Sequence, residues 1–136
     1  MVEIDIINEK EYRKLIKRLS EICEYFKLVV PVELDEISSI ISNLKSEYIY
    51  EGYTNTWPGT KVSRGRRKNF KEYKFSISDK SMDILKSYGS FIKDDNDAYV
   101  SFDGYQIDIS FYKNDNCVFY TTAHEGVCMI DEKIML

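Results

Sequence analysis

Proline and glycine are scarce in this sequence, with two prolines and six glycines among 136 residues. Flexible linkers are usually rich in these turn-forming residues, so we expect residues 1–136 to form a single domain of ordinary size. Hydrophobic residues make up 43% of the chain and charged residues 31%. This balance is typical of a globular protein and excludes an intrinsically disordered one.

Long hydrophobic runs are also missing. The longest, Leu28–Val32, has five residues and contains Pro31, whereas a membrane-spanning helix needs about 20. Charged residues are spread through residues 1–20, a pattern that excludes the apolar centre of a secretory signal peptide. We therefore expect no membrane contact and a cytoplasmic location.

Cysteine and histidine are too few for the common zinc sites. Cys23, Cys117 and Cys128 show no CxxC spacing, and His124 is the only histidine. A turn near His124 would leave Cys117 and Cys128 roughly 16–20 Å apart along a hairpin, too far for a disulfide. Free buried thiols are therefore predicted. The acidic run Asp94–Asp97 lacks the glycine and the glutamate that a calcium loop requires, so no metal and no cofactor are expected.

Catalytic signatures are absent as well, because GxGxxG, GxxxxGK[ST], GxSxG and HExxH do not occur. His124 stands beside Gly126 at a predicted turn, where an exposed turn residue is the ordinary interpretation. The alternative is a general base for Cys117 or Cys128. Those two cysteines lie in apolar contexts, which do not lower the pKa of a thiol. We therefore expect a protein that is not an enzyme.

Helical structure is predicted for residues 8–44. Apolar residues recur with helical spacing from Tyr12 to Phe26, which predicts a helix over residues 8–27. Asn8 followed by Glu11 has the spacing of a capping box. Residues 28–32 are expected to end this helix. A second helix is predicted over residues 33–44, with acidic residues at its N-terminal end.

The remainder of the chain, residues 46–136, is expected to form mainly strands. Strands are predicted over residues 48–51 and 71–78, where side chains alternate with a period of two. Ser78 or Asp79 is expected to cap a short helix near residues 79–89, which Gly89 would close.

The C-terminal third is predicted to be a meander of antiparallel strands. Asp103-Gly104 is a strong signal for a two-residue hairpin. Folding on it would pair Val100 with Ile107 and would place Ile109 on the same apolar face. The opposite face would then carry Tyr99, Ser101, Asp103, Gln106, Asp108, Ser110 and Tyr112. Further turns are predicted at residues 114–116 and 124–126.

These elements predict an α+β fold. We expect an antiparallel sheet of about five or six strands, with two N-terminal helices and one short helix packed on one face. Consecutive strands near the C-terminus are joined by turns too short for helical crossovers, which excludes a parallel sheet.

One stretch has a charge opposite to that of the chain. Residues 61–74 contain seven Lys/Arg and one Glu, hence +6, which leaves −10 for the other residues of a chain of net charge −4. Arg64, Arg66, Arg67 and Lys68 could contact phosphates, with Trp57 and Phe70 available for stacking. However, the acidic remainder weakens attraction to a polyanion. A solvated loop is the first interpretation of this basic loop, and contact with an anion or a partner is the second.

A protein-binding function is favoured by the acidic charge, the missing catalytic groups and the abundance of tyrosine, which often anchors interfaces. In general character the chain resembles the immunity proteins that bacteria produce together with nuclease toxins, many of which are small, acidic and α+β. That resemblance implies an inhibitor of a basic protein partner. The alternative is an RNA-binding module or a small ribonuclease that uses the basic loop at residues 61–71. The predicted partner-binding residues are Asp94, Asp95, Asp97, Tyr99, Asp108 and Tyr112.

Overall fold

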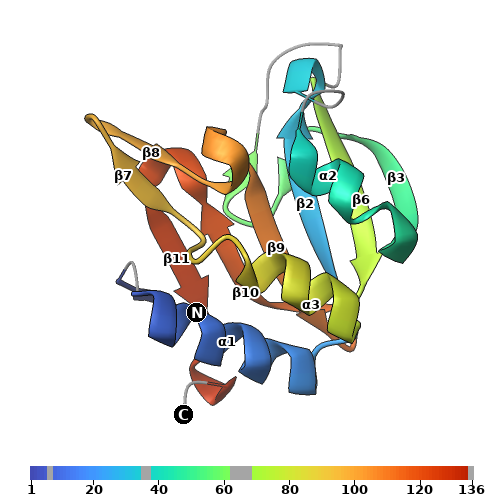
Figure 1. Cartoon of the computed structure of the whole chain (residues 1–136), viewed down its shortest axis with the longest axis vertical. Coiled ribbons are helices and arrows are strands. Elements are labelled where there is room, and N and C mark those ends of the chain that lie inside the picture. The colour runs from blue at the N-terminus through green and yellow to red at the C-terminus, as the bar shows by residue number, and fades with distance from the viewer. Residues whose placement is uncertain (6–7, 35–37, 62–68, 135–136) are drawn as a thin grey trace.

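The computed structural model describes residues 1–5, 8–34, 38–61 and 69–134. Within these ranges, seven strands form one antiparallel sheet in the order β1-β11-β10-β9-β2-β6-β3 (Figure 1). The α+β class and the antiparallel sheet are thus confirmed, and the main sheet is larger than the five or six strands expected. Its strands are β1 (Val2–Ile4), β2 (Tyr25–Pro31), β3 (Tyr48–Thr54), β6 (Phe70–Ser76), β9 (Asp108–Lys113), β10 (Asn116–Thr122) and β11 (Val127–Ile130).

The helices and two small hairpins complete the described part of the chain. In the view of Figure 1, α2 and α3 lie in front of the main sheet. The helices are α1 (Glu9–Ile22), α2 (Ser39–Asn43) and α3 (Asp79–Lys86). The hairpins pair β4 (Thr56–Trp57) with β5 (Thr60–Lys61) and β7 (Lys93–Asp95) with β8 (Ala98–Val100).

The first helix begins as predicted and ends earlier. Asn8 caps α1, because its Oδ1 accepts a hydrogen bond from the backbone N–H of Glu11 at 2.9 Å. The backbone turns extended at Cys23, with φ −102° and ψ 153°, and residues 25–31 form β2. The predicted helix over residues 23–27 is therefore wrong, as is the interpretation of residues 28–32 as a simple helix end. β2 lies between β9 and β6 and is buried on most of its length.

The two predicted strands are found, and the later helices are shorter than predicted. The second helix was predicted over residues 33–44 with an acidic N-terminal end, whereas Val32–Leu34 form a separate 3-10 turn and α2 begins only at Ser39, with no acidic residue in its first turn. Residues 35–37 lie outside the described ranges. Ser78 caps α3 in a capping box: its Oγ accepts from Ser81 N–H at 3.0 Å, and Ser81 Oγ accepts from Ser78 N–H at 2.9 Å. β3 and β6 correspond to the strands predicted from Tyr48 and from Lys71, and β6 ends at Ser76.

The predicted hairpin at Asp103-Gly104 is wrong. β8 pairs with β7 instead, so that Val100 lies opposite Lys93 rather than Ile107. Asp103 has a left-handed backbone, with φ 60°, inside a short 3-10 turn. Its carboxylate accepts hydrogen bonds from the backbone N–H of Ile40 at 2.9 Å and from the Tyr88 hydroxyl at 3.0 Å. Asp103 thus supplies the N-terminal acceptor for α2 from a distant part of the chain.

One core joins the helices to the apolar face of the sheet. Buried residues of α1 and α3 share a single cluster with alternate residues of the central strands. Aromatic rings run across it, since the ring of Phe26 lies 5.5 Å from those of both Phe75 and Phe111, between centroids. Tyr12 of α1 packs edge-on against Phe91 at 4.7 Å. Such contacts, repeated along the sheet, hold the helices in place.

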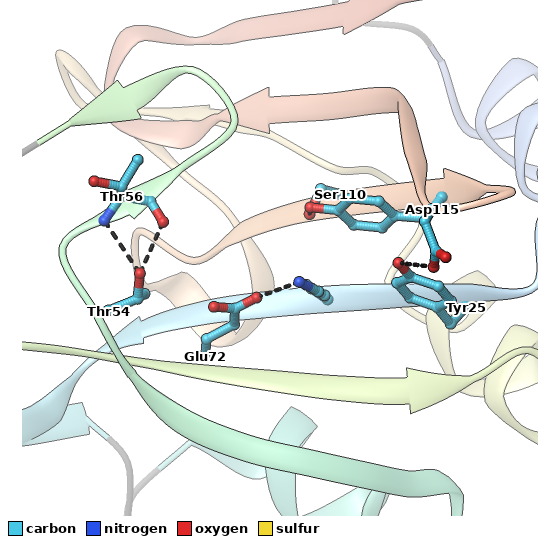
Figure 2. A network of polar contacts seen from close by, with 8 residues as sticks. Tyr25, Thr54, Thr56, Glu72, Ser110 and Asp115 are labelled. Atoms are coloured by element: carbon cyan, nitrogen blue, oxygen red, sulfur yellow. Dashed lines mark hydrogen bonds and ion pairs between the residues drawn. The ribbon is translucent and has the colours of Figure 1, made fainter.

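The other face of the main sheet carries polar and tyrosine side chains, and we call it the polar face. Register places Tyr25 beside Tyr112 on this face, and their rings stack at 4.9 Å. Lys27 pairs with Glu72 at 2.7 Å. Figure 2 shows that the hydroxyl of Tyr25 reaches Asp115, to which it donates at 2.9 Å. Many polar groups on this face are therefore already paired within the chain. The residues concerned are Tyr25, Lys27, Glu72, Lys74, Ser110 and Tyr112.

Candidate protein-binding surface

Four of the six predicted partner-binding residues lie together on the β7–β8 hairpin. Asp94 is opposite Tyr99, and Asp95 is opposite Ala98. The turn between the strands consists of Asn96 and Asp97, whose φ values of 47° and 68° are both left-handed. Two successive residues with positive φ are typical of the type I′ hairpin turn, whose twist matches that of the flanking strands. Asn and Asp adopt this left-handed conformation more readily than most other residues. Residues 93–99 are all exposed, and the hairpin extends away from the main sheet (Figure 1).

The base of this acidic hairpin is fixed to the core. Phe91 is buried, and its carbonyl accepts a hydrogen bond from the hydroxyl of Ser101 at 2.8 Å. The ring of Tyr99 lies against Gly126, where an added Cβ would come within 2.8 Å of the ring carbons. Gln106 donates to the carbonyl of Tyr99 at 3.3 Å. These contacts fix the direction in which the tip projects.

Negative charge is concentrated at this hairpin. Its two strands and turn carry three carboxylates and one lysine, Lys93. No ion pair to those carboxylates occurs among the residues that the structure describes. A groove of about 410 Å³ runs along the hairpin's base and is lined by Lys93, Asp94 and Asp95 together with Tyr88 and Asp103. Asp103 is already hydrogen-bonded within the chain. The groove therefore holds two further carboxylates against one lysine, a small acidic excess that suits a lysine or arginine side chain of another molecule.

Asp108 lies elsewhere, on β9, and is only 8% exposed. Its Oδ2 accepts from the indole Nε1–H of Trp57 at 2.7 Å, and its Oδ1 accepts from the backbone N–H of Ala123 at 2.7 Å. Burial raises the pKa of Asp108, and the two hydrogen bonds together with nearby His124 oppose that rise. Both oxygens are thus occupied in tying the β4–β5 hairpin and the turn after β10 to β9.

Tyr112 is also buried, with 8% of its surface exposed. Its ring stacks on Tyr25, and the ammonium of Lys27 lies 5.1 Å from the ring centroid. Burial raises the pKa of Tyr112 to about 12. Asp108 and Tyr112 therefore do not extend the hairpin surface, and the open face on which the sequence placed them is covered by neighbouring side chains.

A second cavity, of about 620 Å³, lies beside Asp108 and is lined in part by Trp57, Phe70 and His124. The rings of Trp57 and Phe70 pack on one another at 4.7 Å, so the indole is engaged within the chain. His124 is exposed, in a 3-10 turn, with Nε2 3.5 Å from a carboxylate oxygen of Glu125. The interpretation of His124 as an exposed turn residue is confirmed.

The cysteines are free thiols, as predicted. Cys128 and Cys23 are buried and Cys117 is half-buried. Burial raises the pKa of Cys117 to about 11 and that of Cys128 to about 12. Both thiols are thus protonated at neutral pH, which disfavours a Cys–His nucleophile. No group of three or more His, Cys, Asp or Glu residues within the described ranges is arranged to hold a metal ion.

Four of the seven basic residues of this stretch lie outside the described ranges. Arg64, Arg66, Arg67 and Lys68 lie outside the described residues, so their role stays a prediction. Lys71 is on β6, where its ammonium lies 3.0 Å from a carboxylate oxygen of Glu51. Part of the positive charge is therefore paired within the chain.

Exposed apolar residues on β3 were missed by the sequence analysis. Tyr48, Ile49, Tyr50 and Tyr53 are 47–57% exposed. Their pattern predicted a strand, but the position of a strand within a sheet depends on pairing with distant residues. Such an edge position has no local sequence signal.

No helix in the described part of the chain has the length and apolarity that a membrane span requires. Comparisons with protein-family models, with curated proteins and with solved structures found no match.

Proposed function

We propose that this chain is a small binding protein that inhibits a basic protein partner, as immunity proteins inhibit nuclease toxins. The acidic β7–β8 hairpin would provide the contact through Asp94, Asp95, Asp97 and Tyr99. The observation that carries the proposal is the exposure of three carboxylates on a projecting hairpin whose base is anchored in the core. An acidic projection whose base is held in place can enter a basic cleft with a smaller loss of conformational entropy than an unanchored loop.

Electrostatics would act mainly on the rate of association. Complementary charges at an interface accelerate encounter strongly at low salt, and this acceleration declines as ionic strength rises. Tyr99, at the side of the hairpin, would add apolar contact area, since tyrosine is among the residues that most often dominate binding energy. The neighbouring acidic groove would accept a lysine or arginine side chain of the partner.

The partner can be sought in the adjacent gene, because toxin and immunity genes are neighbours in the class that the chain resembles. Expression of the neighbouring reading frame should arrest growth, and co-expression of this chain should restore it. A neighbouring product that is harmless and does not bind this chain would contradict the immunity proposal.

The hairpin can be tested by charge reversal in that complex. The variant Asp94→Lys/Asp95→Lys/Asp97→Lys should lower the association rate constant at least tenfold at low salt and flatten its salt dependence. The control Glu21→Lys/Asp83→Lys/Glu132→Lys makes the same change in net charge at exposed positions away from the hairpin. Equal rates for the two variants would show that net charge, and not the hairpin, governs binding.

A further inference from the structure

The edge of the main sheet at β3 is long, and among the described residues it has no neighbouring strand on its outer side. β3 has seven residues and pairs with β6 on one side, and within the described residues no strand pairs with its other side. The opposite edge strand, β1, has three residues. Along an edge strand, alternate N–H and C=O groups point away from the sheet. Natural edges are usually protected by charged residues, especially lysine, by proline, by β-bulges or by short length. β3, with the sequence YIYEGYT, has no lysine or proline. Its irregularity lies between Tyr48 and Tyr50, ahead of the regular pairs over residues 50–54, and its one charged residue, Glu51, is paired with Lys71.

Side chains on β3 add apolar area to this edge. Tyr50 and Tyr53 are 56% and 57% exposed, and Tyr48 and Ile49 are about half exposed. A tyrosine presents roughly 150–250 Å², so the three tyrosines leave roughly 300 Å² uncovered per chain. Two chains would bury about 600 Å² of this kind, before the backbone and Ile49 are counted. A specific interface usually buries about 1,000 Å² or more in total. The tyrosines alone fall short of this area, so the backbone edge and Ile49 must supply the rest, and the association is expected to be weak and reversible.

We propose that β3 pairs antiparallel with β3 of a second copy of this chain, which joins the two seven-stranded sheets edge to edge about a two-fold axis. Such an interface is isologous, since the same strand forms both halves. It is independent of the proposed inhibitor function, because the β7–β8 hairpin lies on the far side of the molecule from β3 (Figure 1).

The alternation of side chains along β3 restricts the register of the dimer. Directly opposed residues on antiparallel strands lie on the same face of the sheet, whereas successive residues of one strand lie on opposite faces. The two-fold axis must therefore pass through a residue position and not between two residues. An axis at Glu51 would oppose two carboxylates directly, which is unfavourable. An axis at Gly52 opposes Gly52 to itself, Tyr50 to Thr54 and Glu51 to Tyr53 of the second copy. The last two pairs are consistent with the faces that pairing with β6 assigns, since Tyr50 and Thr54 share the polar face with Lys74 and Phe70.

Local contacts favour this central position for Gly52. The ring of Tyr50 lies over Gly52, where an added Cβ would be 3.0 Å from the ring carbon that bears the hydroxyl. The ring of Tyr50 therefore occupies the space that a side chain at position 52 would fill, and it covers the centre of the proposed interface. Glu51 is already paired with Lys71 at 3.0 Å, so its position opposite Tyr53 of the second copy leaves no uncompensated charge.

Sedimentation equilibrium over a range of protein concentrations tests the dimer. The wild-type protein should show a reversible monomer–dimer equilibrium with a micromolar dissociation constant. Tyr50→Lys/Tyr53→Lys should weaken it at least tenfold, because lysine on an edge strand opposes pairing. The control Asp83→Asn/Glu132→Gln makes the same change in net charge at exposed positions outside β3 and should leave the equilibrium unchanged. A wild-type protein that stays monomeric at several hundred micromolar, or a dimer that persists in the double variant, would overturn the proposal.

Cross-linking tests the register without disturbing the tyrosine at position 50. Cα atoms of opposed residues lie about 4.5–5.5 Å apart, within the span of a disulfide. A mixture of the Glu51→Cys and Tyr53→Cys proteins should give the mixed disulfide in excess of either homodimer, with the parent protein as a blank for its native thiols. Equal yields of all three dimers, or no cross-link, would refute the Gly52-centred register.

Discussion

Asp108 allows a quantitative test of how the buried polar groups stabilise the fold. Replacement with alanine leaves the indole N–H of Trp57 and the backbone N–H of Ala123 without their acceptor. Each unpaired buried donor costs roughly 1–3 kcal/mol, and the removal of a buried carboxylate recovers part of this. We expect Asp108→Ala to lower the free energy of unfolding at pH 7 by about 2 kcal/mol.

The effect should depend on pH in a direction fixed by the raised pKa. A raised pKa means that the folded protein binds this proton more readily than the unfolded chain does. The part of Asp108's contribution that depends on proton binding is therefore fully present below the ordinary pKa of the carboxyl and is lost as pH rises through the folded pKa, whereas the part due to its two hydrogen bonds remains at pH 7. The difference in unfolding free energy between wild type and Asp108→Ala should thus increase as pH falls from 7 toward 4.

Urea denaturation followed by circular dichroism measures these differences, and Trp57, the only tryptophan, reports locally by fluorescence. Its emission in the wild type should change with a midpoint above 3.8, the ordinary pKa of this side chain. Trp57→Phe removes one donor, and a double-mutant cycle with Asp108→Ala should give a coupling of about 1–2 kcal/mol. A destabilisation that shrinks on acidification, or no coupling between the two residues, would refute the account of Asp108 as a buried acceptor.

Further predictions concern the other contacts. Asp103→Ala should lower the free energy of unfolding by about 2–3 kcal/mol in urea titrations, because Ile40 N–H loses its acceptor and alanine disfavours the left-handed backbone; Asp103→Asn should recover part of the loss, and an equal loss in both would contradict the capping role. Ser78→Ala should cost about 1 kcal/mol through loss of the α3 cap, with Ser87→Ala as a control outside the capping box. Thiol-reactive dye at pH 8 should label half-buried Cys117 first and buried Cys128 only on unfolding; rapid labelling of Cys128 in the folded protein would contradict its burial.

Local sequence signals predicted the elements whose causes are local. The Asn8 cap and the Ser78 capping box depend on residues three positions apart, and both occur in the structure. The turn at residues 114–116 is likewise found, as Asn114 and Asp115 with left-handed backbones between β9 and β10. These features need no knowledge of the rest of the fold.

Errors arose where distant residues decide the structure. β2 is central and mostly buried, so its residues lack the alternation that marks a half-exposed strand. Phe26 also continues the apolar period of α1, and the helix was therefore predicted to run too far. Asp103 was predicted in a hairpin turn, but its carboxylate instead accepts a hydrogen bond from the backbone N–H of a residue 63 positions away, near the start of α2. The prediction of Asp108 as a surface residue failed for the same reason. Asp108 is buried against Trp57 of the β4–β5 hairpin, and no local sequence pattern indicates where that hairpin lies.

The order of strands in the sheet has a consequence for synthesis of the chain. Central β2 pairs with β9 across some eighty residues, and β1 pairs with β11 near the other end of the sequence. On a translating ribosome, β2 can pair with β6 well before β9 emerges, while the apolar side chains of Phe26 and Leu28 still lack their neighbours Phe111 and Ile109. The sheet therefore closes late and from the C-terminal side. Until then the nascent chain exposes strand edges of the kind that chaperones protect from aggregation.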